Sequence, residues 1–124
     1  VTPAPAVLVH MCAIGEWSNA QNLGFIHPDT SADVDFVHLS TPGQVHLPAN
    51  RIYRGRQDLV LLHIDPALLD SPIRWEPGVP TDPESMVFPH LYGPLPVTAV
   101  TRVDAYRPGP DGTFAPLAGS QDAT

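Results

Sequence analysis

The chain has 124 residues, of which 43% are hydrophobic and 16 are proline, and its formal net charge at pH 7 is −7. This length predicts one domain with a single hydrophobic core. The acidic balance, with six arginines and no lysine, disfavours a surface for nucleic acid or for an anionic membrane, so we expect neither partner.

The cysteine content and the first residues predict a cytoplasmic protein. The single cysteine, Cys12, cannot form an internal disulfide, as is usual in a reducing compartment. The start, VTPAPAVLV, lacks the basic region of a signal peptide, and no apolar run approaches the ~18 residues that a membrane span requires. Nothing in the sequence indicates the oligomeric state.

The first third of the chain predicts a strand followed by a helix. Residues 6–11 (AVLVHM) are apolar apart from one histidine and predict a buried strand. Residues 14–22 carry apolar side chains near helical spacing, and Gly24 is a natural helix stop. A polar loop over residues 27–35 leads to a brief strand over residues 36–39.

The middle of the chain predicts an interrupted helix and a central strand. Thr41 and Gln44 match a capping box, so a helix should begin at this point. Pro48 removes an internal hydrogen bond, so we expect a break or kink there, with a second helical turn through Asn50 to Arg54 and a stop at Gly55. Residues 58–65 (DLVLLHID) are apolar throughout their middle and predict the central strand.

The last part predicts short strands separated by turns and a proline-rich loop. A single helical turn is expected at PALL, and strands are expected over residues 73–76, around Leu91 and over residues 98–106. The loop occupies residues 78–85. Many short strands with two or three short helices predict a small α+β domain.

We place this domain at residues 1–106 and a C-terminal extension at residues 107–124. The extension has a turn signal at Asp111 and Gly112 and little other pattern. It either wraps Phe114 and Leu117 onto the domain or is a mobile tail.

Three of the six histidines interrupt otherwise apolar strands. His10, His38 and His90 stand in VLVHMC, DFVHLS and FPHLYG, and one polar residue per strand is how a sheet collects functional groups in a cleft. The alternative is three unrelated histidines, each satisfied in the core. The other histidines are expected to be structural or solvent-exposed: His63, His27 and His46.

Common motifs of metal binding and catalysis are missing. The histidines lack the close spacing of zinc ligands, so we expect no metal. The sequence contains no phosphate-binding glycine loop and no serine-nucleophile elbow. The arginines of RIYRGR either end a solvated helix or hold a phosphate, which a guanidinium binds in pairs of hydrogen bonds.

Several segments together resemble a known family. VLVHM, GEW, FVHLSTPGQV, ANRIYRG, DLVLLHID, IRWE and FPHLYGPLPVTAV resemble, in this order, the small bacterial family called domain of unknown function 952, over about residues 7–103. More distantly, VHMC, VHLS and the RG before LVLLHID resemble the RNA 2′-phosphotransferases. These enzymes share the ADP-ribosyltransferase fold, so the resemblance implies a split β-sheet that binds NAD.

The distant resemblance also implies roles for individual residues. His10 corresponds to a histidine that orients the ribose next to nicotinamide. His38 and Ser40 correspond to a histidine–leucine–serine motif on the nicotinamide or acceptor side. Arg54, followed by glycine, corresponds to an arginine that meets phosphate.

The segment FPHLYGPLP falls near the third motif of that fold. There His90 and Tyr92 would shape or activate the acceptor position, and prolines would hold them toward the ligand. Many transferases of this fold carry a glutamate in this motif, and FPHLYGP has none, which counts against transfer to arginine-type acceptors. The alternative is a stiff edge strand that tolerates proline.

The sequence therefore favours a small domain with a histidine-lined cleft that binds NAD or a related nucleotide. If it is an enzyme, it transfers or hydrolyses the ADP-ribosyl group. A non-catalytic module for a small ligand and a scaffold recruited for other chemistry, such as a biosynthetic cyclisation, remain open alternatives.

Overall fold

The computed structural model describes residues 7–28, 35–77 and 87–115, which form a small α+β domain. Along the chain its strands, α-helices and 3-10 helices (η) are β1 (Leu8–Ala13), α1 (Ile14–Leu23), β2 (Phe25–Ile26), β3 (Val37–His38), α2 (His46–Ile52), β4 (Leu59–Ile64), η2 (Pro66–Leu68), β5 (Ile73–Pro77), β6 (Val87–Leu91), β7 (Leu95–Pro96), η3 (Val97–Ala99) and β8 (Val100–Tyr106).

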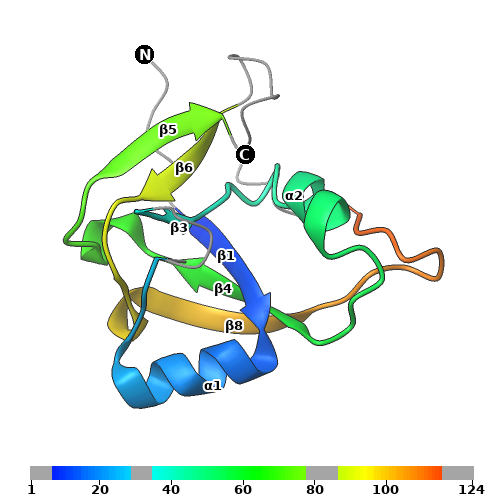
Figure 1. The fold of residues 1–124 in the computed structure, drawn as a ribbon, viewed down its shortest axis with the longest axis horizontal. Helices are drawn as coiled ribbons and strands as arrows, with labels where there is room; N and C mark the ends of the chain where they lie inside the picture. The colour runs from blue at the N-terminus through cyan, green and yellow to red at the C-terminus, as the bar shows by residue number, and fades with distance from the viewer. Residues whose placement is uncertain (1–6, 29–34, 78–86, 116–124) are drawn as a thin grey trace.

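The strands form two antiparallel three-stranded sheets and one short ladder. The first sheet has the order β1-β4-β8, the second has the order β3-β6-β5, and β2 pairs with β7. In Figure 1 the hairpin of β5 and β6 stands above the first sheet, α1 runs along the bottom, and α2 lies at the right. Val9 and Ser40 join the two large sheets through two backbone hydrogen bonds of 2.8 Å each.

The hydrophobic core consists of two clusters on opposite faces of the first sheet. Strand β4 serves both, because alternate side chains of a strand point to opposite faces. Leu62 and Ile64 face the cluster between the sheets, whereas Leu59 and Leu61 face the cluster beside α2. Each fully buried leucine stabilises the fold by ~1.5–3 kcal/mol. Burial on both faces explains the unbroken apolar run, and the predicted central position of this strand is confirmed.

Helix α1 begins and ends close to the predicted residues. It covers Ile14–Leu23, and Gly24 ends it in the left-handed conformation with a φ of 95°. The Gly24 N–H donates to the Ala20 carbonyl at 2.7 Å, as in a glycine helix stop. Ala20 is the buried residue of this helix.

Helix α2 differs from the prediction at both its start and its proline. It begins at His46, because Thr41 and Gln44 close a separate turn in which the Thr41 N–H donates to Gln44 Oε1 at 3.1 Å. Pro48 is the third helical residue, where an N–H has no partner within the helix. The helix therefore runs through Pro48 without the predicted break, and it ends at Ile52 instead of Arg54.

Other boundaries moved by a few residues. Strand β1 continues to Ala13, two residues beyond its predicted end, and the predicted start of the last strand at Thr98 lies in η3. Most of the predicted loop over residues 27–35 and the whole loop over residues 78–85 lie outside the described residues.

The start of the C-terminal extension packs onto the domain. Phe114 is buried and its ring lies 4.8 Å from that of Tyr106. The Asn50 side chain donates to the Phe114 carbonyl at 2.9 Å and accepts from the Phe114 N–H at 2.6 Å. Phe114 therefore belongs to the core beside α2, while Leu117 lies outside the described residues.

The glycine of FPHLYGPLP lies where two segments touch. Beyond β6, the Tyr92 N–H donates to the Pro72 carbonyl at 2.9 Å, which brings Gly93 against Ser71. A Cβ atom on residue 93 would overlap Ser71 Oγ and lie 2.6 Å from Ser71 Cβ. The glycine is needed for this close approach.

Gly93→Ala should therefore destabilise the domain by about 1–3 kcal/mol, the usual cost of forcing extra atoms into a packed site. Urea denaturation measures this free energy of unfolding. Gly43 faces open space, so Gly43→Ala is the matched control and should change it by less than about 0.5 kcal/mol. Ser71→Gly should restore most of the stability of the Gly93→Ala variant, and equal unfolding midpoints for the two alanine variants would contradict the packing argument.

Candidate functional site

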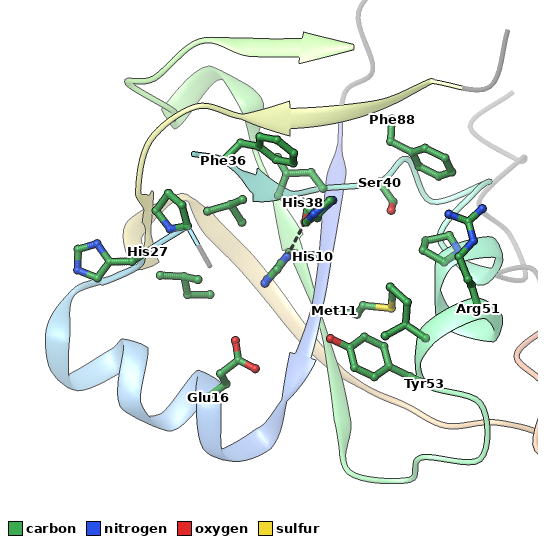
Figure 2. A pocket seen from close by; sticks show the side chains of 16 residues that line it. His10, Met11, Glu16, His27, Phe36, His38, Ser40, Arg51, Tyr53 and Phe88 are labelled. Atoms are coloured by element: carbon green, nitrogen blue, oxygen red, sulfur yellow. Dashed lines mark hydrogen bonds between the residues drawn. The ribbon is translucent and has the colours of Figure 1, made fainter. Parts of the chain in front are cut away.

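A cavity of about 560 Å³ opens between β1, α1, β3 and α2. This volume lies within the range of small-ligand sites. Figure 2 shows its side chains, with Glu16 on α1 across the cavity from Arg51 on α2. The polar side chains that line it are His10, Glu16, His27, His38, Ser40, Arg51 and Tyr53. Apolar side chains, among them Phe36 and Phe88, form the rest of the wall.

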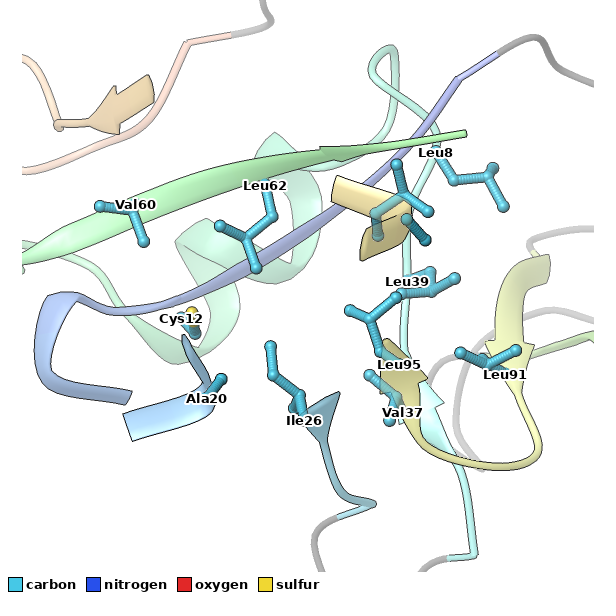
Figure 3. Packing of buried hydrophobic residues seen from close by; sticks show 12 residues of the cluster. Leu8, Cys12, Ala20, Ile26, Val37, Leu39, Val60, Leu62, Leu91 and Leu95 are labelled. Atoms are coloured by element: carbon cyan, nitrogen blue, oxygen red, sulfur yellow. The ribbon is translucent and has the colours of Figure 1, made fainter. Parts of the chain in front are cut away.

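Strand β1 places His10 at the border between the core and the cavity. Leu8 and Cys12 have the same parity as His10 along the strand and belong to the cluster between the sheets, where Figure 3 shows them. His10 occupies the position between them and lines the cavity. An imidazole therefore replaces an apolar side chain on the inner face of the sheet.

The hydrogen bond of His10 determines which ring nitrogen carries the proton. Nδ1 lies 2.7 Å from the backbone oxygen of His38, and a carbonyl can only accept, so Nδ1 is the donor. Burial lowers the pKa of His10 below its ordinary value of 6.5, although the bond to His38 and the charge of Glu16 act in the opposite direction. At neutral pH the ring is therefore uncharged, and Nε2 is an acceptor.

The acceptor nitrogen of His10 has no partner among the residues that the structure describes. Nε2 is buried and accepts no hydrogen bond there. A buried polar atom without a partner costs about 1–3 kcal/mol. A ligand that donates an O–H or N–H group to this nitrogen would recover that energy.

His38 lines the cavity together with His10, as we expected for two of the three histidines, and Ser40 lines it as well. Ser40 is buried and is held by its two backbone hydrogen bonds to Val9. The His38 ring is exposed and stands edge-on to Phe36, with 4.8 Å between the ring centroids. The structure thus brings His10, His38 and Ser40 together from β1 and the β3 segment.

His90 and Tyr92 lie behind the cavity wall rather than in it. His90 is only 2% exposed, and its Nδ1 lies 2.9 Å from Glu76 Oε1. The Tyr92 hydroxyl donates to the same oxygen at 2.6 Å. His90 meets the cavity wall through two rings that line it, the edge of His38 at 4.9 Å and the stacked face of Phe36 at 4.0 Å between centroids. Of the three histidines expected to face one cleft, His10 and His38 line it and His90 does not.

Strand β6 is not an edge strand, because it lies between β3 and β5. Its Pro89 lacks an N–H, yet its carbonyl accepts from the Leu39 N–H at 3.0 Å. The interpretation of FPHLYGPLP as a stiff edge strand is therefore wrong.

The predicted phosphate-binding arginine, Arg54, is not among the residues that line the cavity, whereas Arg51 is. Helix α2 ends at Ile52, so Arg54 lies beyond it on the exposed turn. Pro48, Arg51 and Ile52 line the cavity together because residues three and four apart share one face of a helix. This spacing is a signal in the sequence that could have identified Arg51.

Two carboxylates near these residues were not predicted. Glu16 lies in the first turn of α1 and lines the cavity. Glu76 lies on β5, and hydrogen bonds from Tyr92 and His90 lower the pKa of its carboxyl group. The hydrogen bond between Tyr92 and Glu76 raises the pKa of the Tyr92 hydroxyl. Alternation along IRWE puts Arg74 and Glu76 on one face, but only the pairing of β5 with β6 places Glu76 beside His90.

The remaining titratable groups differ in their surroundings. His63 Nε2 lies 2.9 Å from Asp104 on β8, His27 is exposed at the rim of the cavity, and His46, which we expected to be exposed, is half-buried. Burial raises the pKa of the Cys12 thiol to about 12.

No three His, Cys, Asp or Glu side chains gather into a metal-binding group within residues 7–28, 35–77 and 87–115. Over the same ranges, neither α-helix is long and apolar enough to cross a membrane.

Because the pKa of His10 is lower in the folded protein than its ordinary 6.5, the unfolded chain binds this proton more readily in acid. The contribution of the uncharged, buried His10 to the free energy of unfolding is therefore complete above about pH 6.5. It decreases as the pH falls toward the pKa that His10 has in the folded protein. His10→Gln removes this titration and leaves the carboxylates unchanged. Its free energy of unfolding, measured in urea between about pH 7.5 and pH 5, should fall less than that of the wild type. Parallel pH profiles for the two proteins would refute the burial argument.

Comparison with known proteins places the chain in a family. The family model described as "Protein of unknown function (DUF952)" matches residues 11–103. The crystal structure of protein CC0527 from Caulobacter crescentus is 28% identical, covers 95% of this chain and 99% of that chain, and has a TM-score of 0.74. The solution structure of CC0527 is 29% identical, covers 94% and 97%, and has a TM-score of 0.73. No curated protein matches. The chain, with its cavity between β1, α1, β3 and α2, belongs to the DUF952 family.

Proposed function

We propose that the cavity binds a nucleotide of the NAD class. The observation that carries this proposal is the buried acceptor Nε2 of His10, which has no partner among the described residues and lies in a cavity that also contains the Glu16 carboxylate. A ribose offers neighbouring hydroxyl groups, which can donate to a nitrogen lone pair and to a carboxylate. His10 would thus orient the ribose.

The opposite side of the cavity suits the phosphates. Figure 2 shows Arg51 across the cavity from Glu16, and a guanidinium binds phosphate oxygens with charge-assisted hydrogen bonds. The net charge of −7 repels anions at a distance, so a local cation has to supply the attraction. In this arrangement Arg51 has the role that the sequence had suggested for Arg54.

The walls between these two ends suit a flat ring. Phe36, His38, Tyr53 and Phe88 provide aromatic surface, and aromatic side chains favour stacked or edge-on contact with other rings. A nicotinamide or adenine ring would pack here. His38 and Ser40 would meet the nicotinamide side, with the Ser40 hydroxyl available for a hydrogen bond.

An ADP-ribosyltransferase-like fold is part of the same proposal. Its support is the division of the main β-structure into two sheets that meet at Val9 and Ser40, next to His10 and His38. If bound NAD reacts, the bond between nicotinamide and the ribose carbon breaks, and its electron pair leaves with nicotinamide. The Glu16 carboxylate would stabilise the oxocarbenium-like carbon, and His10 or Glu16 would accept the proton of an attacking hydroxyl or water.

A binding module without turnover is the second candidate. It is favoured because Glu76 occupies hydrogen-bonding groups of both His90 and Tyr92, and neither residue lines the cavity. We therefore assign neither of them direct contact with the ligand. Chromatographic measurement of nicotinamide release separates the two candidates, since only an enzyme releases nicotinamide.

NAD at about 100 times its Kd should raise the free energy of unfolding by about 2.7 kcal/mol, which appears as a higher melting temperature. Arg51→Gln removes the charge that meets phosphate and should weaken binding roughly 10-fold or more. Arg54→Gln is the matched control, because Arg54 lies three residues away but outside the cavity lining, and it should bind NAD about as well as the wild type.

Melting scans with NAD, NADP and ADP-ribose, followed by titration calorimetry on the three proteins, make this comparison. If none of the three ligands shifts the melting temperature of the folded wild type, the proposal of a nucleotide fails. If Arg54→Gln weakens binding as much as Arg51→Gln, the placement of the phosphates fails.

A further inference from the structure

The outer face of the second sheet carries a cluster of polar and aromatic side chains that is continuous with the cavity wall. Residues of like parity on β5 and β6 point to this face, among them Arg74, Glu76 and His90. His38 on β3 is paired directly with His90 and shares the face. The cluster therefore reaches the cavity through His38 and through Phe36, which stacks on His90.

The His90 ring is held at one edge by a hydrogen bond to Glu76. Its Nδ1 lies 2.9 Å from Glu76 Oε1, and the same oxygen accepts from the Tyr92 hydroxyl at 2.6 Å. The Arg74 guanidinium lies over the Tyr92 ring at 4.7 Å from its centroid. Glu76 thus has two donors that prevent it from turning away, and the Nδ1 bond sets the plane of the His90 ring.

The His90 ring in turn sets the surroundings of His38. Phe36 stacks on His90 with 4.0 Å between centroids and 8° between planes, and the His38 ring stands edge-on to both. The Leu39 N–H bonds to the Pro89 carbonyl, so the adjacent His38–His90 pair carries no ladder hydrogen bonds and its side chains approach closely.

From this geometry we propose that Glu76 and His90 are positioning residues that act on the cavity through His38. Glu76 orients His90, and the stacked pair of His90 and Phe36 holds the His38 ring at the cavity wall. Neither Glu76 nor His90 lines the cavity, so neither touches a ligand there. The consequence for NAD affinity rests on the proposed function, whereas the effect on the His38 ring does not.

The chain offers a matched control for each partner. His63 and Asp104 form a second imidazole–carboxylate pair, also 2.9 Å apart, on β4 and β8 outside the cavity lining. Glu76→Ala and Asp104→Ala each delete the carboxylate of such a pair, and His90→Phe and His63→Phe each delete its imidazole while keeping a ring. If losing an imidazole–carboxylate pair affects the protein wherever the pair lies, the variant at the His63–Asp104 pair should show the same effect as the matching variant at the His90–Glu76 pair.

Nuclear Overhauser contacts between the Phe36 and His38 rings provide the first readout. Glu76→Ala removes no ring, so a weakening of these contacts reports a reoriented His38, and Asp104→Ala should leave them as in the wild type. Calorimetric titration with NAD provides the second readout. Glu76→Ala and His90→Phe should each weaken binding on the order of 3- to 10-fold. The double variant should be no weaker than the worse single variant, because both substitutions delete the hydrogen bond between His90 and Glu76.

Unchanged ring contacts in a folded Glu76→Ala protein would overturn the proposal, and so would an affinity equal to that of Asp104→Ala. If Glu76→Ala does not fold, Tyr92→Phe deletes only one of the two hydrogen bonds to Glu76 and should weaken the same contacts to a smaller degree. If wild-type protein does not bind NAD, the nucleotide proposal fails, and the ring contacts alone decide whether Glu76 and His90 position His38.

Discussion

The two backbone hydrogen bonds between Val9 and Ser40 are the contact on which the site depends. They join the sheet β1-β4-β8 to the segment that follows β3, and they lie one residue from His10 and two residues from His38. With this bridge in place, the His38 carbonyl comes within 2.7 Å of His10 Nδ1. A shift of one residue in this pairing would turn His10 to the opposite face and bury it in the core, since strand side chains alternate.

The bridge also explains why a polar cavity is tolerated at the edge of the core. An uncharged imidazole with one satisfied nitrogen costs far less to bury than a charged one, and the carbonyl of His38 supplies that hydrogen bond. The unsatisfied nitrogen faces the cavity, where a ligand can reach it. Leu8 and Cys12 pack on either side and keep the strand in register. The strand that stabilises the core thus also carries the imidazole that faces the cavity.

Much of the secondary structure could be predicted because its causes are local. Gly24 ends α1 through its own backbone conformation, and the apolar run of β4 indicates burial on both faces. The proline in α2 misled the prediction because its cost depends on its position in the helix, and the start of the helix was placed four residues too early. The three- and four-residue spacing of Pro48, Arg51 and Ile52 could have indicated that Arg51 shares a helix face with them. The choice between Arg51 and Arg54 required knowing that the helix ends at Ile52.

The sequence by itself determined the small α+β class, the membership of the DUF952 family and the interruption of three apolar strands by His10, His38 and His90. Each depends on residue type and order along the chain. The tertiary structure alone decided that His90 lies behind His38, that Glu76 bonds to His90 and Tyr92, and that Glu16 faces Arg51 across a cavity. These contacts depend on which strands pair and in which register, and strands distant in sequence acquire their register only when the two sheets close over a common core.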